Sequence, residues 1–215
     1  MPDDTPCSCG CPNTFSTKEA DADLKRYLKT GPNPSTRALI EAIVAEGIEG
    51  ATLLDIGSGI GAIQLGLLAA GATGAESVDA TDAYVTVARA EAERRGYGDR
   101  TRGHVGDFVA LAAEIDAADV VTLDKVVCCY SDMPALMTRA AAHSRRMVGL
   151  VYPRTTWWNR LAARVMAAWG WLTRDPTRWH LHATADIDRI LRGAGFERRE
   201  VDRTFIWQVV LYVRA

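Results

Sequence analysis

The stretch "LLDIGSGIGA", residues 53–62, decides the fold. It begins with a short apolar run of the length of a buried strand, and an apolar segment of helical composition follows at 62–70. Between the two stand Gly57, Gly59 and Gly61. Because glycine has no Cβ, such a loop can turn tightly and bring its backbone N–H groups close to a ligand. The stretch therefore predicts a strand, a ligand-binding loop and a helix, in that order.

Strands and helices continue to alternate beyond this unit. Short apolar runs are followed by segments with helical periodicity, such as 83–95 and the segment after Asp132. This alternation predicts an α/β fold: a doubly wound, mostly parallel, Rossmann-like sheet with helices on both faces and an antiparallel last strand. Ligands bind such sheets at the carboxyl ends of the strands. The expected strands are 52–56, 76–80, 103–107, 119–123, 147–152 and 205–213.

The chain divides into an arm, two N-terminal helices and one α/β domain. Residues 1–16 are rich in turn-forming residues, which predicts a mobile arm. Helices are expected within 17–50, the first with Ser16 and Glu19 as a capping box, and the domain covers 51–215. An insert at about 156–173 carries Trp158, Leu161, Val165 and Trp169 at helical spacing. This helix could pack in the core, close over the site as a lid, or lie on a membrane surface.

Composition restricts the partners. The chain has 215 residues and a formal net charge of −2, which gives no support to nucleic-acid binding through bulk charge. It shows no signal peptide and no apolar run of the ~20 residues that span a bilayer, so we expect a cytoplasmic protein with no integral membrane span. Its five cysteines are then expected to be reduced thiols.

Acidic residues follow three successive expected strands. The glycine pattern also fits a dinucleotide-binding loop, but Asp55 stands two residues before the first glycine, and Asp79 and Asp107 end the next two strands. Carboxylates at these positions would repel a pyrophosphate. They suit a ligand with an amine, a ribose diol and an adenine amino group, and S-adenosylmethionine is such a ligand.

With this motif set, the sequence resembles the class I S-adenosylmethionine-dependent methyltransferases over roughly residues 50–215. "LLDIGSGIGA" is similar to their first motif, "SVDATD" to the acidic ribose motif, "GHVGDF" to the adenine motif, and "ADVVTLDKVV" to the fourth strand. The resemblance implies that Asp79 accepts from the ribose, that Asp107 meets the adenine, and that Asp124 and Lys125 lie near the methionine moiety and the substrate. The implied cofactor-binding residues are Tyr27, Asp55, Gly57, Ser58, Gly59, Gly61, Asp79, Ala80, Gly106, Asp107, Phe108, Asp124 and Lys125.

A narrower resemblance is to small bacterial methyltransferases that carry "CCYxD" after the fourth strand and "YPRxxWW" after the fifth. A more distant one is to magnesium-protoporphyrin O-methyltransferases, which share the short N-terminal helices. Neither resemblance carries a substrate over to this chain. We expect a small-molecule acceptor, with its reacting O, N or S atom left open. Protein and nucleic-acid methylation are disfavoured, because the sequence has no N/D-P-P-Y/W-type motif after the fourth strand.

Three side chains are candidates for proton transfer or substrate contact: Cys128, Tyr152 and His182. Cys128 follows the fourth expected strand, so we expect it to border the substrate pocket, whereas Cys129 is expected to act as a small hydrophobic residue. The "CSCGC" of the arm lacks zinc spacing, and no metal is predicted. Two alternatives stay open: a thiolate site for a soft metal or metalloid, and a non-catalytic nucleotide-binding or metal-sensing module on this fold.

Overall fold

A computed structural model describes residues 16–173 and 180–215. Most of the predicted arm, including Cys7, Cys9 and Cys11, therefore lies outside the described residues. The helices are α1 (Thr17–Thr30), α2 (Pro34–Ala45), α3 (Ala62–Ala69), α4 (Asp82–Arg94), α5 (Phe108–Leu111), α6 (Met133–Ala142), α7 (Trp157–Thr173) and α8 (Thr184–Gly193), with 3-10 turns η1 (Gly98–Arg100), η2 (Ala112–Glu114) and η3 (Val127–Cys129).

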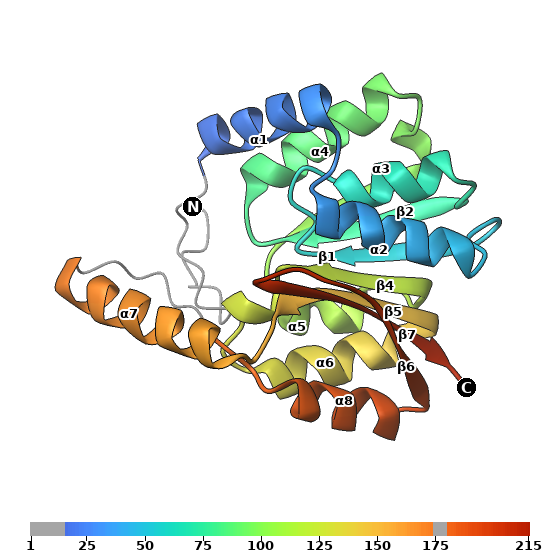
Figure 1. Cartoon of the computed structure of the whole chain (residues 1–215). Coiled ribbons are helices and arrows are strands. Elements are labelled where there is room, and N and C mark those ends of the chain that lie inside the picture. Colours follow the sequence, from blue (N-terminus) through green and yellow to red (C-terminus); the bar gives the residue numbers. More distant parts are fainter. Residues whose placement is uncertain (1–15, 174–179) are drawn as a thin grey trace.

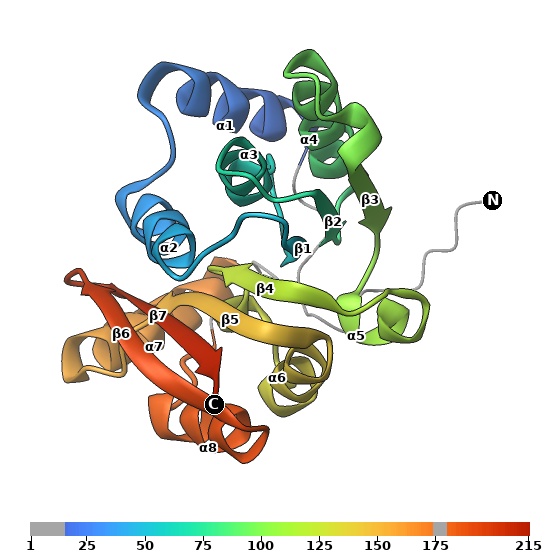
Figure 2. The same cartoon turned by 90° about the vertical axis from the view of Figure 1, so that its right-hand side faces the viewer.

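One seven-stranded sheet runs through the described residues, in the order β3-β2-β1-β4-β5-β7-β6 (Figures 1 and 2). The pairs from β3 to β5 are parallel, and β7 is antiparallel to both of its neighbours. The predicted fold class, with its mostly parallel sheet, is confirmed. The strands are β1 (Thr52–Ile56), β2 (Gly74–Asp79), β3 (Thr101–Val105), β4 (Ala118–Asp124), β5 (Ser144–Pro153), β6 (Phe196–Arg203) and β7 (Trp207–Arg214).

Helices cover both faces of the sheet, and two apolar clusters form the core. One cluster joins α6 and α8 to the sheet through residues such as Leu136 and Ile187. The other joins α2 and α3 to the opposite face through Leu39 and Leu67. Figure 2 shows α1 to α4 on one side of the sheet and α5, α6 and α8 on the other. Both faces are thus excluded from water, and this explains the nearly continuous apolar sequence of β1 and β4.

Strand β6 was missed by the sequence interpretation. Its sequence, "FERREVDR", is mostly charged, and only Phe196 is buried. It is the edge strand beside β7, where one side of the strand has no neighbour. Charged side chains are typical of such edges because they prevent pairing with other chains. The strand predicted at 205–213 is observed as β7, which begins two residues later at Trp207 because Phe205 and Ile206 form the turn between β6 and β7.

Local signals at helix starts were read correctly where a side chain caps the helix. The Glu19 carboxylate accepts a hydrogen bond from the Ser16 backbone N–H at 2.8 Å, as in a capping box. Asp132 accepts from the Ala135 N–H at 3.1 Å and starts α6. None of the helices described is long and apolar enough to cross a membrane.

Candidate functional site

A cavity of ≈ 430 Å³ lies at the carboxyl ends of β1, β2 and β4. The link between α1 and α2 covers one side of it, through Gly31, Pro32 and Asn33. Its volume falls in the ~300–1,000 Å³ range of small-molecule sites. Of the residues implied as cofactor-binding, all except Gly61 line this cavity: Tyr27, Asp55, Gly57, Ser58, Gly59, Asp79, Ala80, Gly106, Asp107, Phe108, Asp124 and Lys125.

The backbone of the glycine loop passes very close to the side chain of Val126. Gly57 has a φ of +66°, and a Cβ built there would lie 2.2 Å from Cγ2 of Val126. Gly61 has a φ of +77° and precedes the first residue of α3, so it turns the chain into the helix and does not line the cavity. Any side chain at residue 57 would collide with the loop after β4. The loop is therefore held against this neighbour, with its backbone facing the cavity.

Asp79 ties the glycine loop to the end of β2. Its Oδ2 accepts from the Gly59 N–H at 2.9 Å, and its Oδ1 accepts from the Thr81 N–H at 3.0 Å. Burial raises the pKa of this carboxyl, and the two backbone hydrogen bonds act in the opposite direction. Asp79 thus combines a structural role in the loop with a position on the cavity wall.

Asp55, at the end of β1, is the most deeply buried acid of the site. It is 1% exposed, and its Oδ1 accepts a hydrogen bond from the Thr122 hydroxyl at 2.7 Å. Its Oδ2 has no hydrogen-bond partner among the described residues. Burial, with smaller contributions from the carboxylates of Asp124 and Asp79, raises the pKa of Asp55 to about 7. A buried oxygen of this kind calls for a hydrogen-bond donor beyond the described residues.

Asp107 is positioned by a short chain of hydrogen bonds. It caps α5 by accepting from the Val109 N–H at 3.0 Å, and it accepts from the Tyr130 hydroxyl at 2.7 Å. Nε2 of His182 lies 2.8 Å from the Tyr130 carbonyl oxygen. Phe108 follows Asp107 and packs edge-on against His143, with ring centroids 5.4 Å apart. His182 therefore supports the backbone of a cavity-lining residue and does not line the cavity itself.

A small cluster around Lys125 lines the cavity where the chain leaves β4. Its Nζ lies 3.1 Å from Oδ1 of Asp124 and 5.7 Å from the centroid of the Trp207 ring. The Thr36 hydroxyl of α2 donates to Oδ2 of Asp124 at 2.5 Å. Lys125 has a φ of +63°, which is uncommon for a residue with a side chain. The chain leaves β4 in a strained conformation here, as often happens at functional sites.

Helix α1 contributes residues that sequence reasoning overlooked. Asp23 and Arg26 line the cavity beside Tyr27. The Tyr84 hydroxyl of α4 donates to Oδ2 of Asp23 at 2.8 Å, and burial together with this carboxylate raises the pKa of Tyr84. This bond joins α1 to α4 through two residues of the cavity lining. No local motif marks Asp23 or Tyr84, because their meeting depends on how α1 packs on α4.

The expected position of Cys128 at the border of the substrate pocket is wrong, and Cys129 takes that position instead. Cys128 is 2% exposed and does not line the cavity, whereas Cys129 lines it. The reversal arises because the strand ends at Asp124 and the chain continues through the strained Lys125 into the 3-10 turn η3, so strand alternation no longer applies. Both thiols approach the Lys125 carbonyl oxygen, at 3.3 Å from Cys128 and 3.7 Å from Cys129.

Tyr152 is also remote from the cavity. It is 1% exposed and belongs to the apolar cluster between the sheet and helices α6 and α8. Burial raises the pKa of its hydroxyl. Successive residues of β5 face opposite sides of the sheet, and Tyr152 faces the side that packs on α6 and α8. A position at the end of the strand therefore does not by itself place this side chain in the cavity. None of the three candidates Cys128, Tyr152 and His182 lines the cavity.

Two further expectations concern metals and the tryptophan-rich segment. Among the described residues, no group of three or more His, Cys, Asp or Glu side chains is placed to hold a metal ion. The segment forms α7, but Trp157, Leu161 and Val165 are 72%, 55% and 61% exposed. For these side chains the core-packing interpretation is wrong, because nothing in the described chain covers them.

The sheet order and the acid-lined cavity beside a glycine loop define a Rossmann-like nucleotide-binding domain. Residues 24–201 match the family described as "Methyltransferase domain". The chain therefore belongs to this methyltransferase family, and the predicted class is confirmed.

Individual relatives agree with this assignment. The ribosomal protein L11 methyltransferase of Methylococcus capsulatus is 30% identical over 114 residues, which are 47% of this chain and 39% of that protein, so the chain spans well under half the length of this relative. The magnesium protoporphyrin IX methyltransferase of Synechocystis, solved with bound SAH, has a TM-score of 0.67 and 22% identity, covering 96% of this chain and 91% of that one. An O-methyltransferase family protein of Burkholderia thailandensis has a TM-score of 0.72 and 18% identity, covering 94% and 61%.

Proposed function

We propose that the chain uses S-adenosylmethionine to methylate a small-molecule acceptor. The observation that carries this proposal is the cavity of ≈ 430 Å³, in which Asp55, Asp79 and Asp107 stand at the ends of three strands beside the glycine loop. The residues fit the cofactor. Asp55 presents a buried oxygen that has no partner among the described residues, and Gly57 lets the loop pass close to Val126 with its backbone on the cavity wall.

Each carboxylate has a separate part in holding the cofactor. Asp79, already fixed by two backbone N–H groups, accepts from the ribose hydroxyls. Asp107, oriented by Tyr130, accepts from the adenine amino group, with Phe108 beside the ring. Asp55 and Asp124 face the methionine moiety, where the cationic amine stabilises their ionised forms.

The bound cofactor supplies a methyl group on a sulfonium centre, which an O, N or S nucleophile can take by in-line displacement. The chain mainly positions the acceptor, within ~3–3.5 Å of the methyl. Lys125, Thr36 and Cys129 line the cavity, and we assign them to this task because Thr36 and Lys125 also contact each other at 3.5 Å. Asn33, on the link between α1 and α2, lines the same cavity.

Calorimetry with S-adenosylhomocysteine tests the cofactor assignment. Asp79→Ala should weaken binding by ~1.5–3 kcal/mol, about tenfold to hundredfold, because a charged acceptor is lost. Asp99→Ala is the matched control, since Asp99 is exposed and lies away from the cavity. Equal affinities for the wild type and the Asp79 variant would contradict the assignment.

Methyl transfer to a small molecule is tested by a screen against phenols, thiols, carboxylates and arsenite. The release of S-adenosylhomocysteine is measured as the readout. Product from at least one acceptor, lost in Asp79→Ala, is the expected result. Cofactor binding without transfer to any acceptor would instead favour the non-catalytic module.

A further inference from the structure

Five apolar side chains form one exposed edge of the molecule, here termed the apolar edge. Three lie on α7 at intervals of four residues, and two lie in the turn between β6 and β7. All are well exposed, and the lowest value is 41%. A soluble protein rarely leaves so many large apolar groups together in water without a binding role. The apolar edge consists of Trp157, Leu161, Val165, Phe205 and Ile206.

The apolar edge is held together by specific contacts. The Trp158 ring stacks on Phe205 at a centroid distance of 5.2 Å and an interplanar angle of 9°. Nδ2 of Asn159, a buried residue, donates to the carbonyl oxygens of Arg154 and Ile206 at 2.8 and 3.1 Å. The first turn of α7 and the β6–β7 turn are therefore fastened to each other. This arrangement presents apolar groups from two distant segments on one side.

The α7 part of the apolar edge carries positive charge. Arg160 and Arg164 are exposed on α7 between its apolar residues. No Asp or Glu occurs from Met133 to Arg174, although the whole chain has 27 acidic residues. Such segregation within a chain of net charge −2 is typical of a surface that meets an anionic partner.

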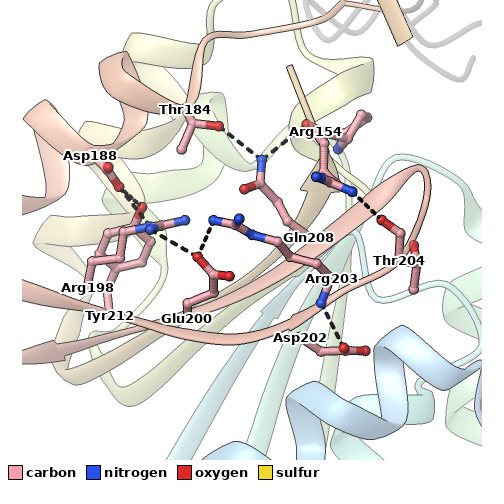
Figure 3. Close-up of polar contacts among 11 residues, drawn as sticks. Arg154, Thr184, Asp188, Arg198, Glu200, Asp202, Arg203, Thr204, Gln208 and Tyr212 are labelled. Atoms are coloured by element: carbon pink, nitrogen blue, oxygen red, sulfur yellow. Dashed lines mark hydrogen bonds and ion pairs between the residues drawn. The ribbon is translucent and has the colours of Figure 1, made fainter. Parts of the chain in front are cut away.

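Two arginines lie beside the β6–β7 turn, Arg154 after β5 and Arg203 at the end of β6 (Figure 3). Arg154 donates to the Thr204 carbonyl oxygen at 2.9 Å and so braces the turn. Two acids of β6 close to the turn are bonded to Arg203: Glu200 through the guanidinium and Asp202 through the backbone N–H. The ion pair with Arg203 therefore offsets the charge of Glu200.

Shape selects the kind of partner. Figure 1 shows α7 extending outward from the body of the molecule. A projecting ridge of tryptophan, aliphatic and arginine side chains does not form a groove for a peptide. It matches the surface of a bilayer, where apolar side chains enter the headgroup boundary and arginines meet anionic lipids. We infer that the apolar edge is a docking surface for an anionic lipid bilayer.

Docking would orient the catalytic domain. Helix α7 follows β5, so its first turn lies at the carboxyl edge of the sheet, the edge at which the cavity opens. The inference itself depends only on the apolar edge and its charges. It can therefore fail or hold independently of the cofactor assignment.

Vesicle sedimentation with the full chain tests the inference. Vesicles of phosphatidylcholine alone are compared with vesicles of phosphatidylcholine and phosphatidylglycerol, at low and high salt. The expected result is binding to the anionic vesicles, weakened by salt, with little binding to phosphatidylcholine alone. Leu161→Glu should lower the partition coefficient roughly tenfold, because it removes an inserted apolar group and adds a repelled charge.

Leu28→Glu is the matched control. Leu28 is 52% exposed on α1, close to the 55% of Leu161, and belongs to neither the apolar edge nor the cavity lining. This variant should bind vesicles as the wild type does, and circular dichroism should show both variants folded. Three results would overturn the inference: no vesicle binding, equal loss in both variants, or a wild-type dimer that Leu161→Glu converts to a monomer without any vesicle binding.

Discussion

Asp55→Asn should remove a pH dependence of stability that the wild type carries. In the unfolded chain this carboxyl titrates near 3.8, whereas in the folded protein burial raises its pKa to about 7. Between these two values the folded state binds a proton that the unfolded state has released. The free energy of unfolding therefore falls as the pH rises through this window, and it becomes constant above the folded pKa.

The size of the effect follows from the two pKa values. Below the folded pKa, the free energy of unfolding of the wild type should fall by ~1.36 kcal/mol per unit of pH. From pH ~5 to ~8 it should therefore fall by about 2.5 kcal/mol more in the wild type than in Asp55→Asn. For a chain of this size that corresponds to a difference of roughly 5–10 °C in Tm. Urea denaturation of the cofactor-free protein at a series of pH values measures it. Acids that do not interact with Asp55 contribute equally to both proteins and cancel in the difference, whereas Asp79 and Asp124 interact with it and add a smaller change of their own.

A second variant checks the cause. Thr122 donates to Oδ1 of Asp55 and thereby lowers its pKa. Thr122→Val should move the window to higher pH, because the ionised form loses its hydrogen bond. If the wild type and Asp55→Asn show parallel stability curves, the carboxylate is ionised throughout, and the account of the buried Oδ2 fails.

Three further predictions concern the same cavity. Gly57→Ala should lower the Tm and abolish S-adenosylhomocysteine binding in calorimetry, because its Cβ meets Cγ2 of Val126 at 2.2 Å; adding Val126→Ala should recover part of the Tm, and an unchanged Tm in the single variant would contradict the packing. Cys129 should react with iodoacetamide before Cys128, as peptide mass mapping can show, and S-adenosylhomocysteine should slow the reaction; faster labelling of Cys128, which is 2% exposed, would count against the geometry of η3. Tyr130→Phe should weaken S-adenosylhomocysteine binding by ~0.5–1.5 kcal/mol, because the hydrogen bond that orients Asp107 is lost. Full retention of affinity would show that the bond from the Val109 N–H is enough to hold Asp107 in place.

The sequence predicted correctly those residues whose position depends on local chemistry. The loop at Gly57 and the acids at Asp55 and Asp79 belong to strand ends, and parallel strands bring their carboxyl ends to one edge. The positions of these residues on the cavity wall could therefore be predicted without any tertiary contact. The cap at Asp132 is similarly local, because its partner N–H lies three residues away.

Other features depend on contacts that are distant in sequence. The bond between Asp23 and Tyr84 spans 61 positions, and no pattern in either segment marks it. Strand β6 has the composition of a solvated helix or loop, and only its pairing with β7 makes it a strand. The exposure of α7 is a third case. Its periodicity showed one apolar face, but periodicity does not state whether anything covers that face.

The cysteine pair shows how a single backbone conformation redirects a site. If the chain had continued as a strand after Asp124, alternation would decide which thiol faces the cavity. Instead Lys125 takes a φ of +63°, its N–H still donates to the Val151 carbonyl at 2.8 Å, and η3 follows at once. The left-handed residue turns the chain while keeping Lys125 itself beside Asp124 and the cavity. The same strain thus buries Cys128 and places Cys129 on the wall. The backbone conformation of residue 125 therefore accompanies the reversal of the two thiols, with Cys129 and not Cys128 on the cavity wall.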